Sequence, residues 1–156
     1  MDTILKYLFA NLNGATETVL LFILVFFDTI LGSKWRKANN VAITSNGGLG
    51  GLKISIPLAL APMVIWLITI LFSVLPTHIG NRVFVFDTPI FDWITFATFI
   101  GIANFMSKSL LANAQLAGFT VPNWAIKWVE DEYHVKLKKI ETEPEAANIT
   151  EIGKEK

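Results

Sequence analysis

One aspartate stands inside an otherwise apolar stretch near the N-terminus, and its type and position suggest chemistry more than those of any other residue. Asp28 follows the apolar run Val19–Phe27 and precedes the basic residues Lys34, Arg36 and Lys37. A charged side chain at membrane depth costs about 2.5–3.5 kcal/mol on insertion scales, so such residues usually mark a polar pathway or a helix contact. Two interpretations stay open. The carboxylate reaches water or the basic residues at the membrane surface, or it lines a pore or an oligomer contact.

The other ionisable and nucleophilic side chains show no pattern typical of catalysis or metal binding. The chain has no cysteine, which excludes thiolate chemistry. His78 and His134 lie far apart in the sequence, and the topology predicted below puts a membrane between them. Asp87 and Asp92 are more typical of a solvated boundary than of an acid–base pair. The sequence therefore predicts no enzyme and no catalytic, cofactor-binding or metal-binding residue.

The glycine-rich segment 45–53 superficially resembles a phosphate-binding loop. Such a loop needs a preceding strand and a Gly-Lys-Ser/Thr ending, and this segment has neither. We instead interpret Gly47, Gly48, Gly50 and Gly51 as a tight turn that returns the chain to the bilayer, since glycine adopts turn conformations at no steric cost.

Composition and hydropathy indicate the elements that must position these residues. The chain is 53% hydrophobic and 17% charged, whereas soluble domains carry roughly 25% charged residues. A helix needs about 20 mostly apolar residues to cross the hydrocarbon core. The sequence predicts an all-α membrane protein with about three transmembrane helices, at residues 15–33, 54–75 and 89–111. A formal net charge of zero gives no reason to expect a nucleic-acid partner.

The basic residues of the first loop predict the topology. Lys34, Arg36, Lys37 and Lys53 stand there without an acidic residue, and positive charge in short loops marks the cytoplasmic side. We therefore expect a multi-pass protein with its N-terminus outside, its C-terminus in the cytoplasm, and these four side chains close to anionic lipid headgroups.

The regions outside the predicted spans are expected to differ in how well structured they are. Residues 1–14 form an outer or interfacial segment, and the chain is expected to be inserted whole, without a removable signal peptide. Residues 121–140 form an amphipathic helix at the interface or in the cytoplasm, with the charges of 130–139 on a solvated face. Residues 141–156 form a flexible tail.

Small and polar residues on the third predicted span are candidates for helix contacts. Ala97 and Gly101 are four residues apart, a spacing that lets helix backbones approach closely in lipid. Asn104 and Asn113 add polar groups that need partners inside the bilayer or at its edge. Together with Asp28, these four residues are the predicted helix–helix or pore contacts.

The ordered set of these features resembles the toxin-secretion/phage-lysis holin family of three-span bacteriophage holins. The matching residues are Phe27, Asp28, Thr29, Gly32, Lys34, Ser45, Gly48, Gly51, Leu52, Lys53, Ser109, Asn113, Gly118 and Pro122. The resemblance covers about residues 20–130. Leu31 and Ala112 depart from it, because the family commonly has threonine and glutamate at these positions.

The resemblance implies a function in the bacterial cytoplasmic membrane. Such proteins accumulate there, oligomerise, and form lesions that collapse the membrane potential and release an endolysin, or a toxin, for host lysis. The implied partners are the lipid bilayer, other copies of the same chain, and an endolysin that needs no direct contact. The alternative is a small membrane scaffold or a subunit of a larger transport complex.

Overall fold

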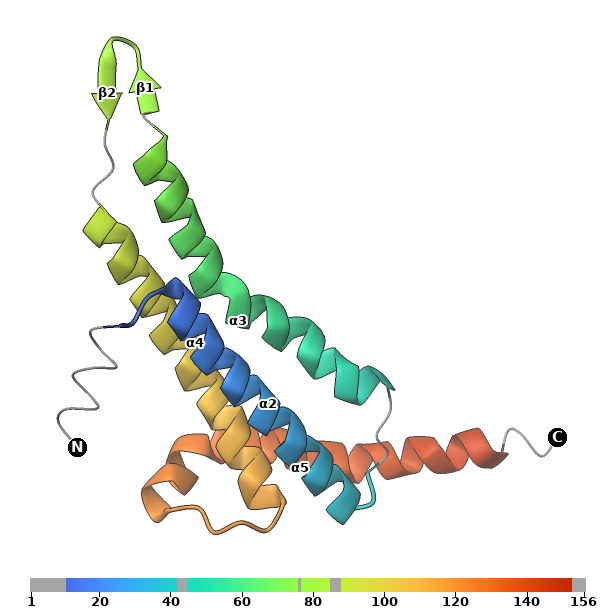
Figure 1. Cartoon of the computed structure of the whole chain (residues 1–156). Coiled ribbons are helices and arrows are strands. Elements are labelled where there is room, and N and C mark those ends of the chain that lie inside the picture. Colours follow the sequence, from blue (N-terminus) through green and yellow to red (C-terminus); the bar gives the residue numbers. More distant parts are fainter. Residues whose placement is uncertain (1–10, 42–44, 76, 85–87, 153–156) are drawn as a thin grey trace. The chain divides into compact units, whose positions relative to one another are not determined.

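The computed structural model describes residues 11–41, 45–75, 77–84 and 88–152 (Figure 1). They form the helices α2 (Gly14–Ala38), α3 (Ser45–Val74), α4 (Thr88–Leu116) and α5 (Asn123–Ile152). Between α3 and α4 lies a short antiparallel hairpin, β1 (Thr77–Ile79) and β2 (Arg82–Phe84), which the sequence had not indicated. The predicted all-α class is confirmed.

Three of the helices are long and apolar enough to cross a membrane, and the chain is a multi-pass membrane protein. The three segments are Gly14–Ala38, Gly51–Val74 and Ile90–Leu116. Helices α2 and α4 run about five residues past the predicted ends at 33 and 111. Polar and basic residues continue these helices because the backbone hydrogen-bond ladder does not depend on apolar side chains. Of the predicted segment 1–14, residues 1–10 lie outside the described residues.

The glycine-rich segment is helical, so the prediction of a tight turn there is wrong. Helix α3 begins at Ser45 and includes Gly47, Gly48, Gly50 and Gly51. Glycine costs about 1 kcal/mol relative to alanine in a helix. The segment continues without a break into the apolar candidate span Gly51–Val74, so it extends an existing helix, and each added residue closes one more intrahelical hydrogen bond.

The predicted C-terminal helix is present, but the prediction of a flexible tail from residue 141 is wrong for 141–152. Helix α5 begins after Pro122, whose carbonyl oxygen accepts hydrogen bonds from the Ala125 and Ile126 amides. It continues to Ile152, and residues 153–156 lie outside the described residues. Glutamate and alanine are good helix formers, and six of the twelve residues of 141–152 are of these two types, which favours a helix there.

The chain divides into two compact units, which we describe separately. Unit 1 comprises residues 1–23 and 56–103, and unit 2 comprises residues 24–55 and 104–156. Each unit therefore contains parts of α2, α3 and α4, and α5 belongs to unit 2.

In unit 1, the start of α2 packs closely against the middle of α3. A β-carbon added at Gly14 would lie 2.5 Å from the Pro62 carbonyl oxygen and would collide with the Trp66 side chain. One turn later, the buried Thr18 hydroxyl accepts a hydrogen bond of 3.1 Å from the Met63 amide. Proline inside a membrane helix disturbs the backbone ladder, and a side chain of a neighbouring helix can re-satisfy the backbone groups. Thr18 has this role beside Pro62.

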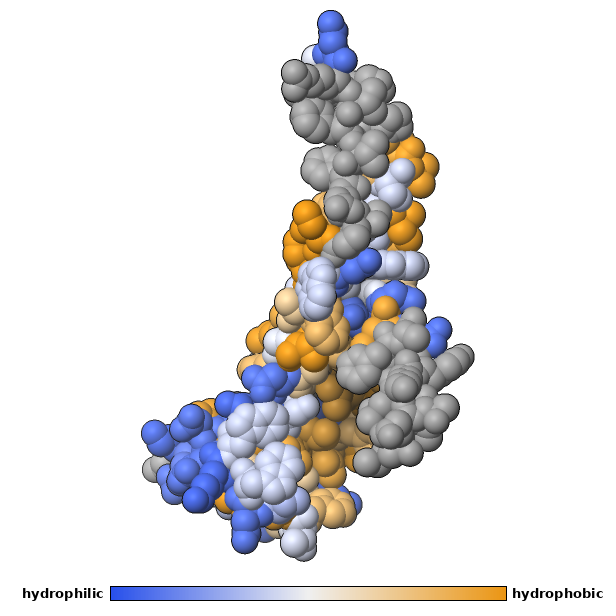
Figure 2. Space-filling model, turned by 90° about the vertical axis from the view of Figure 1, so that its left-hand side faces the viewer, coloured by the Kyte–Doolittle hydropathy of each residue, from blue (hydrophilic) through white to orange (hydrophobic). Residues whose placement is uncertain are grey.

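In unit 2, the first half of α5 packs against the C-terminal parts of α2 and α4 (Figure 1). Ala125 and Val129 are fully buried, and Trp35 and Met106 are almost so. Figure 2 shows hydrophilic residues gathered at the lower left of the face that it draws, beside apolar surface. An amphipathic helix is thus fixed to the polar ends of two membrane helices.

Candidate functional site

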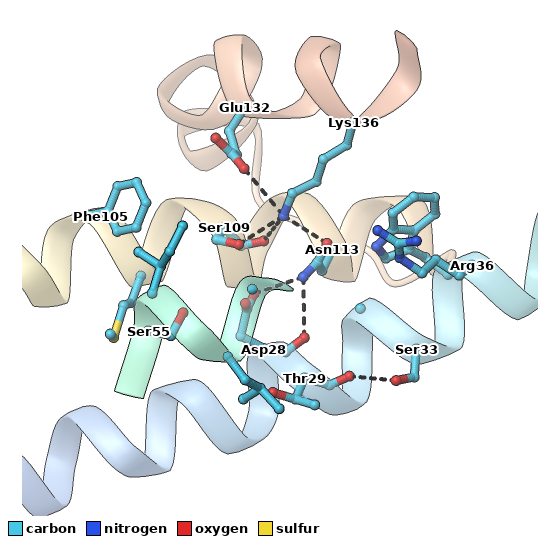
Figure 3. A pocket seen from close by; sticks show the side chains of 16 residues that line it. Asp28, Thr29, Ser33, Arg36, Ser55, Phe105, Ser109, Asn113, Glu132 and Lys136 are labelled. Carbon is cyan, nitrogen blue, oxygen red and sulfur yellow. Dashed lines mark hydrogen bonds and ion pairs between the residues drawn. The ribbon is translucent and has the colours of Figure 1, made fainter. Parts of the chain in front are cut away.

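The candidate site is a cavity of about 270 Å³ within unit 2. Its lining residues come from α2, α3, α4 and α5, and five of them carry the polar network discussed below (Figure 3). These five are Asp28, Ser109, Asn113, Glu132 and Lys136.

Asn113 is the central residue of this network. Its side-chain Nδ2 donates to the Asp28 carboxylate at 2.8 Å and to the Asp28 carbonyl oxygen at 3.2 Å. Its Oδ1 accepts a hydrogen bond of 2.8 Å from Lys136 Nζ. Asn113 is only 4% exposed. A single amide therefore bridges a carboxylate and an ammonium group of opposite charge (Figure 3).

Lys136 joins α5 to α4. Its Nζ donates to the Ser109 carbonyl oxygen and to the Ser109 hydroxyl, both at 2.9 Å, in addition to Asn113. Glu132 adds an ion pair at 3.5 Å. An ammonium group has three hydrogens to donate, and here they meet acceptors although the residue is only 9% exposed. The charge is thereby compensated at a depth where an unpaired ammonium would be costly.

The network arises from a simple local rule, because each of three helices contributes two residues one turn apart. Residues four apart lie on the same helix face, so each pair faces the same cavity. The pairs are Asp28 with Gly32 on α2, Ser109 with Asn113 on α4, and Glu132 with Lys136 on α5.

Gly32 provides the room that the Asn113 amide needs. A β-carbon at this position would lie 3.3 Å from Asn113 Nδ2, which is tighter than an ordinary van der Waals contact. Glycine thus lets the amide reach the Asp28 carboxylate of the preceding turn. Gly32, one of the residues that carry the family resemblance, thus has a packing reason in the structure.

The structure brings together two of the five predicted contact residues, Asp28 and Asn113. It places the other three on surfaces that this chain leaves uncovered, since Ala97, Gly101 and Asn104 are all exposed. A β-carbon at Gly101 would meet no atom within 4 Å in the described residues. A role of these three in contacts with another copy stays a prediction.

The predicted headgroup residues have different surroundings. Lys34 Nζ lies 4.2 Å from the centroid of the Phe119 ring, and Arg36 lines the cavity and lies over the Trp35 ring. Lys37 and Lys53 are exposed, as headgroup contacts would require.

Sequence reasoning missed Lys136 and Glu132, and it named Ser109 only as a residue of the family resemblance. The prediction that the charges of 130–139 lie on a solvated face is wrong for Lys136, which is 9% exposed. A signal was present, because positions 125, 129, 132 and 136 follow the spacing of one buried helix face. The apolar members at 125 and 129 mark that face, and the lysine continues it.

The arrangement fixes a carboxylate, an amide and an ammonium group within one polar cluster that joins three helices. The described residues contain no group of three or more histidine, cysteine, aspartate or glutamate side chains able to hold a metal ion. Comparison with models of known families, with curated proteins and with solved structures finds no match for this chain.

Proposed function

We propose that this chain is a holin, which oligomerises in the bacterial cytoplasmic membrane and forms lesions that dissipate the membrane potential and release an endolysin or a toxin. The observation that carries the proposal is the buried link from Asp28 through Asn113 to Lys136, in a chain whose apolar helix faces are otherwise uncovered.

The uncovered faces support assembly. At most 28% of the most apolar window of each candidate span is buried within the chain, so lipid or other copies must cover the rest. In lipid, helices associate through close packing of small residues and through polar contacts. Ala97, Gly101 and Asn104 supply both kinds of residue on exposed parts of α4.

The polar link supports a switch from a harmless to a permeable state. Within one chain, Asp28 and Lys136 compensate each other through Asn113 and need not face lipid. Many copies can then accumulate without a leak, because these two charges need not be exposed to hydrocarbon. When chains cluster, the same groups can turn toward water and line a lesion. Polar groups are favourable there and costly in lipid.

The proposed orientation follows from the charges. The basic residues Lys34, Arg36, Lys37 and Lys53 favour a cytoplasmic first loop, with the N-terminus outside and α5 in the cytoplasm or at its membrane surface. The length of α5, 30 residues with a polar surface, favours a second candidate function. In that alternative the chain is a scaffold or a subunit whose α5 binds a larger transport complex.

Induced expression of the full chain in bacteria, with no partner supplied, separates the two candidates. A holin stops growth abruptly after a delay and depolarises the membrane. Normal growth and a stable potential at the same membrane density would rule out the holin and favour the scaffold.

A conservative variant tests the role of the polar link in timing. Asp28→Asn keeps the shape of the side chain but removes the charge opposite Lys136, so we expect a shifted delay or no lysis with unchanged membrane insertion. The control is Glu130→Gln, because Glu130 is an exposed residue of α5. If both variants keep the wild-type delay, the Asp28 charge has no part in timing.

A further inference from the structure

Unit 1 contains a second cavity, of about 340 Å³, at the N-terminal ends of α2 and α4. Its lining combines two carboxylates, two further polar side chains and two aromatic rings. These residues are Glu17, Asp92, Asn13, Thr95, Trp93 and Phe96. Glu17 lies in the first turn of α2, where the helix dipole favours negative charge.

Glu17 is the residue that points to a ligand. It is 2% exposed, and its Oε2 has no hydrogen-bond partner among the residues that the structure describes. A buried carboxylate oxygen without a partner is costly, and such groups in native proteins call for an explanation. The helix dipole lowers this cost but does not supply the missing donor.

The neighbouring polar side chains already form hydrogen bonds with the backbone of their own helices. Asn13 Oδ1 accepts hydrogen bonds from the Ala15 and Thr16 amides, at 3.0 and 3.1 Å, as the cap of α2. The Thr95 hydroxyl donates to the Phe91 carbonyl oxygen at 2.8 Å. The other carboxylate of the cavity can accept hydrogen bonds but has none to donate when it is ionised. A bound molecule that carries a hydrogen-bond donor would supply the missing partner of Glu17 Oε2.

The lining selects the chemistry of that molecule. Two carboxylates favour a cation, and the faces of Trp93 and Phe96 favour an organic ammonium group, which aromatic rings attract. A primary ammonium donates three hydrogen bonds, whereas a quaternary ammonium has none for Glu17. A calcium ion takes six to eight oxygen ligands, and the cavity offers only two carboxylates.

We propose that this cavity binds a primary ammonium group, with Glu17 as the hydrogen-bonding anion and Trp93 and Phe96 as its apolar walls. The group can come from an ethanolamine lipid headgroup or from a soluble polyamine. The cavity lies at the ends of candidate spans, where headgroups are found. The proposal is independent of the holin function.

The test uses the full chain in nanodiscs. The first arm mixes phosphatidylethanolamine, phosphatidylcholine and phosphatidylglycerol with identical acyl chains and measures the retained lipids by native mass spectrometry. The second arm titrates spermidine into phosphatidylglycerol nanodiscs and measures the thermal midpoint. Glu17→Gln keeps the size of the side chain, and Glu130→Gln removes an exposed carboxylate outside the cavity.

In the lipid arm we expect the wild type and Glu130→Gln to retain phosphatidylethanolamine at least tenfold over phosphatidylcholine, and Glu17→Gln to lose this preference. Stabilisation by spermidine that Glu17→Gln abolishes would instead assign a soluble amine. Failure of the wild type in both arms overturns the proposal, and so does an unchanged preference in Glu17→Gln. If Glu17→Gln does not fold, the proposal is tested by the wild type alone. It must retain phosphatidylethanolamine in preference to phosphatidylcholine, whose headgroup is a quaternary ammonium.

Discussion

Replacing Lys136 with methionine removes the ammonium group that joins α5 to α4 and keeps an unbranched side chain of similar length. The ammonium nitrogen lies within 2.9 Å of three oxygens, two of Ser109 and one of Asn113. The substitution leaves the Asn113 Oδ1 without its donor and the Asp28 carboxylate without its opposite charge. Helix α5 should therefore detach more easily from the membrane helices.

The size of the effect follows from the kind of bond lost. A hydrogen bond to a charged group contributes about 1.5–3 kcal/mol, and several bonds of one group are not additive. Methionine recovers part of the loss by packing in the same space. We expect a net cost of ~2–3 kcal/mol, which corresponds to a roughly 30- to 150-fold larger opening constant for α5.

Hydrogen–deuterium exchange in lipid nanodiscs measures this opening directly, because exchange of a protected amide requires local unfolding or detachment. The amides of residues 123–138 should exchange faster in Lys136→Met, and the amides at the centre of α3 should not change. Lys127→Met is the matched control, since Lys127 is an exposed residue of the same helix. Equal exchange along α5 in the two variants would refute the reasoning that Lys136 holds the helix.

Two further predictions concern unit 1. Gly14→Ala should destabilise the protein by about 1–3 kcal/mol, because its β-carbon would lie 2.5 Å from the Pro62 carbonyl oxygen. Gly101→Ala, with open space around it, should be neutral or slightly stabilising, and equal thermal midpoints for both variants would contradict this. Thr18→Val should cost about 0.5–1.5 kcal/mol, because it removes the hydrogen bond that the Thr18 hydroxyl accepts from the Met63 amide, whereas Thr18→Ser should keep the wild-type midpoint.

The sequence predicted the class of the fold and the number of candidate spans. Hydropathy over about 20 residues is a local property, so the uncharged run of α3 marks a membrane helix whatever its neighbours do. It also singled out Asp28 and Asn113, because polar side chains in apolar runs need partners. Reasoning from local composition was wrong, however, for the glycine-rich segment and for residues 141–152. There the backbone hydrogen bonds of a helix outweighed what turn and tail compositions suggested.

The pairing of these polar residues was decided only by the tertiary structure. Asp28 and Asn113 are 85 residues apart, and Lys136 lies 23 residues beyond Asn113. Each is fixed to a face of its own helix by the helical repeat, which the sequence shows. Which faces then meet depends on the rotation and depth of three helices against one another. The packing around Gly32, Val129 and Met106 determines which faces meet. This packing involves three helices, so the sequence of a single segment does not predict it.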